Sequence, residues 1–247
     1  MIPQMALGGS MFSFDKLNQI IGSVGRVPIV AEIMASRWSY EALMVKQFKD
    51  NGFEKDYYET ELQKSYANFK QVSYISALKD ALTYANDCRD SIAEEDPTYD
   101  IPRLRNEIDS GLALLREEIP EEMHRVPEIA LDCIDKLYVD SFTEDISEEV
   151  DEYLSDLDHY YSKMYNLAHD ELEARKRYYE ERQPGYYLNR RNKYLNEKLQ
   201  DIVKNVFEKN KIIRYENHLI QQVDPIFLKA DNSSWFGFRA HFYAPEK

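Results

Sequence analysis

The residues that could carry chemistry are five histidines, two cysteines and many carboxylates, and none of them falls in a catalytic pattern. No histidine is followed by glutamate, which excludes the H-E-x-x-H zinc motif, and no glycine is followed by lysine, which excludes a P-loop. The G-x-S-x-G sequence of serine hydrolases is also missing. We therefore predict a protein that is not an enzyme, with no catalytic residue, no cofactor and no metal.

Two weaker signals leave alternatives open. His159 and His169 are ten residues apart and fall near one face of a predicted helix, with Glu173 one turn further on. A metal there would need a third ligand from elsewhere, so surface histidines are the preferred interpretation. Cys88 and Cys133 each lie in a helical pattern, and they fit either two ordinary thiols or one bridge between helices in an oxidising compartment.

Composition favours helices and excludes one class of partner. The chain has 247 residues, with 45 acidic and 31 basic side chains and a net charge of −14. A nucleic-acid-binding surface needs a positive field, so we predict no nucleic-acid partner. Only 8 glycines and 9 prolines interrupt the chain, which favours long helices. No run of 18 apolar residues is present that could span a bilayer.

Apolar residues recur at steps of three and four along most of the chain, which predicts amphipathic helices. Two stripes precede residue 120, the first at Leu62, Tyr66, Phe69, Val72, Ile75, Leu78 and Leu82, and the second at Ile101, Leu104, Ile108, Leu112 and Leu115. Prolines 97 and 102 place a loop between them, and the segment 117–128 ends the second helix.

A heptad-like seam follows in the second half of the chain. It steps by four and three through Val150, Leu154, Leu157, Tyr161, Met164 and Ala168, and it returns at Leu195, Leu199, Ile202 and Val206. The Pro184-Gly185 pair between the two halves predicts an antiparallel helical hairpin. The predicted fold is therefore mainly α: an elongated antiparallel helical bundle or helical hairpins with coiled-coil-like seams.

The two ends differ in character from the middle. Residues 1–48 hold only seven charged side chains and four glycines, and a helix is expected from Pro28 to Phe48. An Asn-Gly pair at Asn51 should break that helix. Residues 223–247 contain five aromatic residues in the last thirteen and are expected to be irregular or β-like. We predict three parts, 1–50, 51–222 and 223–247.

Both end segments resemble parts of one protein family. The sequence SRWSYEALMVKQF, residues 36–48, resembles a segment of bacterial ABC exporter permeases of the G-subfamily or White-pigment kind. The matching residues are Arg37, Trp38, Glu41, Ala42, Leu43, Gln47 and Phe48, and Ser39 stands where alanine is common. Residues 224–247 are similar to the return segment before the final membrane helix in Bacteroidetes-type members.

The resemblance implies a membrane-proximal segment at 1–50, an inserted soluble helical domain at 51–222 and a return segment at 223–247. It implies the extracytoplasmic (periplasmic) face of the cell membrane and a non-catalytic role in gating the exit path or docking partners during export. ATP hydrolysis would lie outside these residues. The implied partners are the permease's own membrane helices, a second permease subunit, a periplasmic protein and the membrane interface.

The resemblance also nominates functional residues. These are Arg37, Trp38, Glu41 and Phe48 at the membrane interface, and Asp224, Pro225, Arg239, His241 and Phe242 in the return segment. Trp38 would lie at headgroup depth, and Arg37 would bind phosphate headgroups or pair with Glu41. Packing at the base of the domain explains Arg37 and Trp38 equally well. The alternative function is a free-standing α-helical scaffold that acts through its seams.

Overall fold

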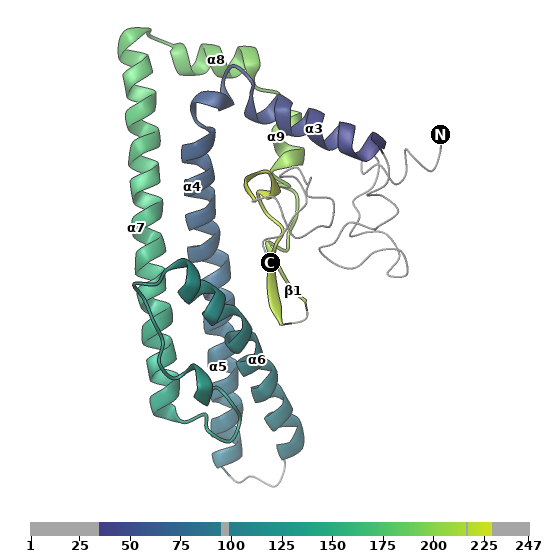
Figure 1. Ribbon diagram of the computed structural model, residues 1–247, viewed down its shortest axis with the longest axis vertical. Helices are drawn as coiled ribbons and strands as arrows, with labels where there is room; N and C mark the ends of the chain where they lie inside the picture. The colour runs from purple at the N-terminus through teal and green to yellow at the C-terminus, as the bar shows by residue number, and fades with distance from the viewer. Residues whose placement is uncertain (1–34, 95–98, 216, 229–247) are drawn as a thin grey trace. The chain divides into compact units, whose positions relative to one another are not determined.

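The computed structural model describes residues 35–94, 99–215 and 217–228, and it confirms the prediction of a mainly α fold (Figure 1). The α-helices are α3 (Ala35–Lys49), α4 (Tyr58–Phe69), α5 (Ile75–Ala93), α6 (Ile101–Arg125), α7 (Glu144–Arg182), α8 (Tyr186–Tyr194) and α9 (Glu197–Val203). None of the helices described is both long and apolar enough to cross a bilayer.

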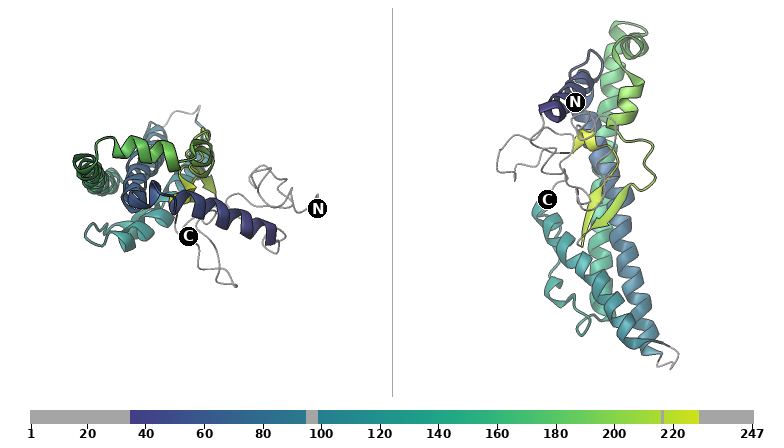
Figure 2. Two further views of the ribbon diagram at one scale, coloured as in Figure 1. Left: turned by 90° about the horizontal axis from the view of Figure 1, so that it is seen from above. Right: turned by 90° about the vertical axis from the view of Figure 1, so that its right-hand side faces the viewer.

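One small sheet follows α9. Strands β1 (Ile212–Tyr215) and β2 (His218–Gln221) pair as a hairpin, which appears as two neighbouring arrows in Figure 2. A short 3-10 helix, η5 (Pro225–Phe227), comes next. The hairpin lies just before residue 223, where the irregular or β-like segment was expected to begin. Residues 229–247 of that segment lie outside the described residues.

The described residues form two compact units. The first unit contains residues up to Tyr66, then Asn166–Ile213, and the residues from Ile220 onward. The second unit contains Ala67–Tyr165 and Arg214–Leu219.

In the second unit, α5 and α6 run antiparallel side by side (Figures 1 and 2). A Cβ atom at Gly111 would lie 3.1 Å from the carbonyl oxygen of Ala81. Such contacts are tight for a backbone neighbour, so a glycine lets the two helices meet here. The helix α6 accommodates Pro120 and ends at Arg125, within the segment where its end was predicted.

The first apolar stripe is interrupted by a π-helical turn, η3 (Lys70–Tyr74), between α4 and α5. Phe69, Ile75 and the stripe residues beyond it are buried as expected, but Val72 is 52% exposed. The wider turn contains one extra residue, so it rotates the following side chains around the helix axis. Lys70 and Tyr74 therefore lie on the buried side of the turn in place of Val72.

The first half of the predicted seam is confirmed in α7. Its residues Val150, Leu154, Leu157, Tyr161 and Ala168 are all buried, and Met164 is half-buried. The helix ends at Arg182, and Gly185 turns the chain with a left-handed φ of 77°.

The second half of the seam does not form a continuous helix, so this part of the hairpin prediction is wrong. The chain is extended at Leu195, and the side chain of Asn196 caps a new helix by accepting a hydrogen bond from Leu199 N at 3.2 Å. The new helix, α9, ends at Val203. Leu199 is buried, whereas Ile202 and Val206 are about half exposed.

Candidate functional site

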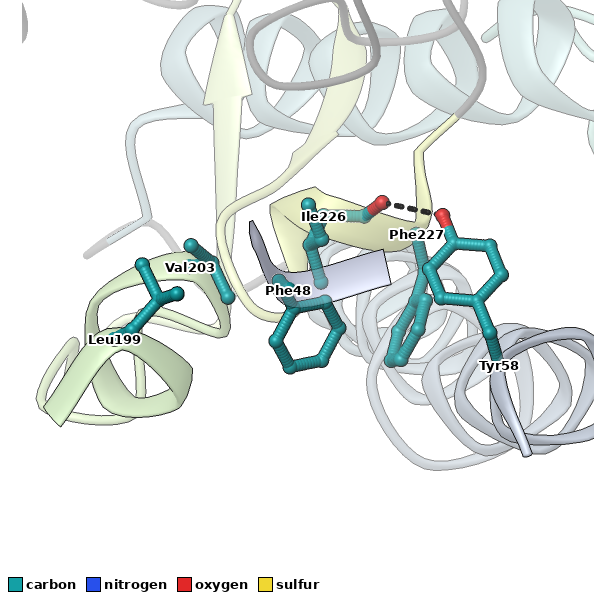
Figure 3. Close-up of a cluster of buried hydrophobic side chains, with 6 residues drawn as sticks. All are labelled: Phe48, Tyr58, Leu199, Val203, Ile226 and Phe227. Atoms are coloured by element: carbon teal, nitrogen blue, oxygen red, sulfur yellow. Dashed lines mark hydrogen bonds between the residues drawn. The ribbon is translucent and has the colours of Figure 1, made fainter. Parts of the chain in front are cut away.

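The last turn of α3 and the return segment meet in one hydrophobic cluster of the first unit. Its buried members are Phe48, Tyr58, Leu199, Val203, Ile226 and Phe227, which we call the junction cluster (Figure 3). Met44, Val45 and Leu62 pack against it. The cluster thus joins α3 and α4, near the start of the described chain, to α9 and η5, near its end.

Three aromatic rings form the centre of the junction cluster. The ring of Phe48 lies 6.2 Å from that of Phe227 and 6.4 Å from that of Tyr58, both edge-to-face. The Tyr58 hydroxyl donates a hydrogen bond of 3.0 Å to the carbonyl oxygen of Ile226 (Figure 3). Edge-to-face pairs add to the stabilisation from buried area. The return segment is therefore held by both an apolar and a polar contact.

Asn51 ends α3 and turns the chain toward α4, as the sequence predicted. Its side-chain nitrogen donates to the carbonyl oxygen of Phe48 at 2.7 Å, and its side-chain oxygen accepts from the amides of Phe53 and Glu54 at 2.8 Å each. Gly52 follows because a Cβ atom there would lie 2.9 Å from the ring of Tyr194. This turn directs Phe48 and Tyr58 into the same cluster.

The return segment is shaped by Asp224. This residue has a left-handed backbone, with φ 53° and ψ 43°, and Pro225 then opens η5. The amide of Asp224 donates to the carbonyl oxygen of Lys204 at 3.0 Å, and the carboxylate of Asp224 accepts from the Ser65 hydroxyl at 2.5 Å. A non-glycine residue with positive φ is uncommon, and these contacts hold it in place.

Charged side chains border the junction cluster. The Lys204 ammonium lies 2.8 Å from the Glu61 carboxylate, and it also lies 5.6 Å and 5.2 Å from the ring centroids of Phe48 and Phe227. Glu54 is 1% exposed, and its Oε2 atom has no hydrogen-bond partner among the described residues. Burial, together with the nearby Glu61 carboxylate, raises the pKa of Glu54 to about 7.

The raised pKa of Glu54 predicts a pH-dependent stability. The folded protein holds a proton on Glu54 up to about pH 7, whereas the unfolded chain loses it near 4.5. The free energy of unfolding is therefore not reduced by Glu54 below pH 4.5. As the pH rises from 4.5 toward 7, Glu54 lowers the free energy of unfolding by about 2–3 kcal/mol. We expect Glu54→Gln to remove this decrease, measured by urea unfolding from pH 5 to 8.

The exposed Glu59 provides a matched control for this experiment. Glu59→Gln makes the same substitution at an exposed position, so it reports how removal of a carboxylate alone affects an acidic chain. The prediction is contradicted when the two variants show the same dependence of unfolding free energy on pH.

The structure brings together only some of the predicted site residues. Phe48 is fully buried in the junction cluster, Glu41 is buried and Trp38 is half-buried in α3. Asp224 and Pro225 directly precede Ile226 and Phe227, which pack in the junction cluster with Phe48. The side chain of Arg37 and the residues Arg239, His241 and Phe242 lie outside the described part. The roles of all these residues at a membrane interface remain predictions.

A buried ion pair in the second unit was not predicted. Lys70 and Glu122 are 4% and 0% exposed, and their charged atoms are 2.5 Å apart. Glu122 also accepts from the Tyr161 hydroxyl and from Arg125. Burial opposes ionisation of Glu122, but Lys70, Tyr161 and Arg125 together hold its pKa below the usual value.

One turn before Glu122, the hairpin contacts α6 through Glu118. Its carboxylate accepts from the amide of Leu219 at 2.8 Å and lies 3.4 Å from His218. A signal was present in the sequence, because Glu118 and Glu122 continue the apolar face of α6 beyond Leu115. Carboxylates at core positions are rare unless they are paired.

The cysteines and histidines for which the sequence left alternatives open lie among the described residues. Cys88 and Cys133 are free thiols, so the alternative of a bridge is wrong. Within the described ranges, no group of three or more His, Cys, Asp or Glu side chains is arranged to hold a metal ion. The Nδ1 atom of His169 instead lies 3.1 Å from the ammonium of Lys64.

Comparison with known proteins identified no matching family model, no similar curated protein and no similar solved structure.

Proposed function

We propose that this chain is the extracytoplasmic domain of an ABC exporter permease. In this role it would catalyse no reaction itself and would help to gate the exit path or dock partner proteins during ATP-driven export. The observation that carries the proposal is the packing of Phe48 against Phe227 in the junction cluster.

A domain inserted between two membrane helices must receive the chain and return it on one side. The last turn of α3 and the start of the return segment meet this requirement, because they share a core within the first unit. Packing of these two segments in separate cores would have argued against a tether to one bilayer face. The Arg-Trp segment of α3, with Trp38 half-buried, lies on the approach to this junction.

The sequence of the complete gene tests this proposal. We expect an apolar run of about 20 residues on each side of the segment. We also expect the full-length protein to sediment with membranes and this segment to be cleaved by protease added to spheroplasts. Finding no such run on either side, or a segment protected from external protease in intact spheroplasts, would overturn the proposal.

The alternative of a free-standing scaffold depends on seams that pair with another chain. In α7 the seam residues Val150, Leu154, Leu157 and Tyr161 are buried against their own chain. A partner helix in a coiled coil would have to contact these same residues, so that part of α7 offers it no apolar seam. The burial therefore favours the permease domain over the scaffold.

A further inference from the structure

The turn after α9 displays three apolar side chains to solvent. Ile202 is 55% exposed, Val206 is 49% exposed and Phe207 is 81% exposed. Phe207 is the most exposed large apolar side chain in the described part of the chain. Contiguous exposed apolar residues in a folded protein commonly mark an interaction site.

The backbone of this turn is held in place by hydrogen bonds. The amide of Val206 donates to the carbonyl oxygen of Asp201, and that of Glu208 donates to the carbonyl oxygen of Asn205. Asn205 has a left-handed φ of 50°, and its side chain donates to the carbonyl oxygen of Gln222 at 2.8 Å. The turn is thus fixed to Gln222, the residue that follows β2, and it presents Val206 and Phe207 with little backbone freedom to lose on binding.

Exposed lysines flank the apolar side chains. Lys198 precedes them, and Lys209 and Lys211 follow them, while the exposed carboxylates Glu197 and Glu208 lie in the same stretch of a chain whose net charge is −14. Apolar residues at the tip with lysines around them are typical of segments that bind the surface of an anionic bilayer. The lysines can contact lipid phosphates while the apolar side chains enter the headgroup region.

The size of the surface argues against a protein partner. A coiled coil needs several heptads, and α9 has only seven residues before the turn begins. A stable protein interface buries roughly 800 Å² on each partner, which is more than three side chains provide. A bilayer requires no matching surface, so a small apolar tip with flanking cations is sufficient.

We propose that the segment 202–211, the apolar turn, binds a bilayer surface that contains anionic phospholipids. Val206 and Phe207 enter the headgroup region, and Lys209 and Lys211 contact phosphates. The inference rests on the proposed function for placing the first unit near a membrane, whereas the exposure and the charges stand independently of it.

Flotation of the purified 247-residue chain with lipid vesicles tests the inference. We expect binding to vesicles of phosphatidylcholine mixed with phosphatidylglycerol, and much weaker binding to phosphatidylcholine alone. The double variant Val206→Ser/Phe207→Ser should bind at least about tenfold more weakly. The matched control is Val72→Ser/Tyr138→Ser, at apolar positions of the second unit that are 52% and 54% exposed, and it should bind like the unmodified chain.

A second arm tests the contribution of the lysines. Lys209→Gln/Lys211→Gln should weaken binding by about tenfold or more and reduce its dependence on salt. The control Lys136→Gln/Lys163→Gln makes the same charge change at exposed positions of the second unit and should have little effect.

A fluorescent reporter shows whether the turn enters the lipid. In a chain carrying Trp38→Phe and Trp235→Phe, a tryptophan introduced by Phe207→Trp should shift to shorter wavelength on binding and be quenched by brominated lipids. An introduced tryptophan that neither shifts nor is quenched would overturn the inference. So would Val206→Ser/Phe207→Ser variants that keep full vesicle binding, or that lose self-association instead.

The two proposals can fail separately. Vesicle binding by the apolar turn with no apolar run in the flanking gene sequence would reject the permease assignment alone. Flanking membrane helices with no vesicle binding would reject the lipid-binding turn alone.

Discussion

Lys70→Met lowers the free energy of unfolding by about 3–5 kcal/mol, because it takes the buried cation away from the buried and ionised Glu122. The two side chains are almost completely excluded from solvent, and their charged atoms are 2.5 Å apart. Removing one member of such a pair costs more than the pair itself contributes to stability. Urea unfolding at pH 7, followed by far-UV circular dichroism, measures the loss.

Two further variants identify the cause of that loss. Lys70→Met/Glu122→Gln should be more stable than Lys70→Met alone, because a neutral amide replaces the buried carboxylate and still accepts from Tyr161. Lys176→Met removes a more exposed pair with Glu173 and should cost less than about 1 kcal/mol. A loss below about 1 kcal/mol for Lys70→Met would contradict the importance of this pair.

Phe48→Ala is expected to destabilise the first unit by about 3–5 kcal/mol, because it leaves a cavity at the centre of the junction cluster. Phe48 is fully buried and contacts the rings of both Tyr58 and Phe227. Urea unfolding gives the magnitude. Hydrogen exchange at the amides of Asp224 and Phe227 should become faster, since the return segment loses its apolar support.

Leu43→Ala provides the control on the same helix. Leu43 is 63% exposed, so its truncation should change stability by less than about 0.5 kcal/mol. Phe48→Leu keeps most of the buried volume and should cost about 1–1.5 kcal/mol. Equal effects of Phe48→Ala and Leu43→Ala on the free energy of unfolding would show that the junction cluster does not hold α3 and the return segment together.

Local patterns in the sequence predict most of the helical fold. The steps of three and four along Val150–Ala168 describe a face that is buried in α7, and the Asn51-Gly52 pair ends α3 as expected. Such signals depend on neighbours within one or two turns, so a single sequence is sufficient to find them. The π-helical turn at 70–74 was missed because one extra residue in a turn leaves no local signal.

The sites depend on contacts that sequence spacing does not show. Lys204 contacts Glu61, 143 positions earlier in the chain, and Lys70 contacts Glu122, 52 positions later. The prediction that Ile202 and Val206 continue a seam failed because Asn196 starts a separate short helix. Their spacing is helical, but their exposure depends on where α9 ends.

The junction cluster also determines which part of the domain would resist mechanical force. Tension applied through the two flanking segments would act first on the contact between Phe48 and Phe227 and on the hydrogen bond from Tyr58 to Ile226. While these contacts hold, the pull would be transmitted directly across the cluster, and the second unit would carry little of it. Under the proposed permease function, both attachment points would then move together during the transport cycle without unfolding of the helices in between.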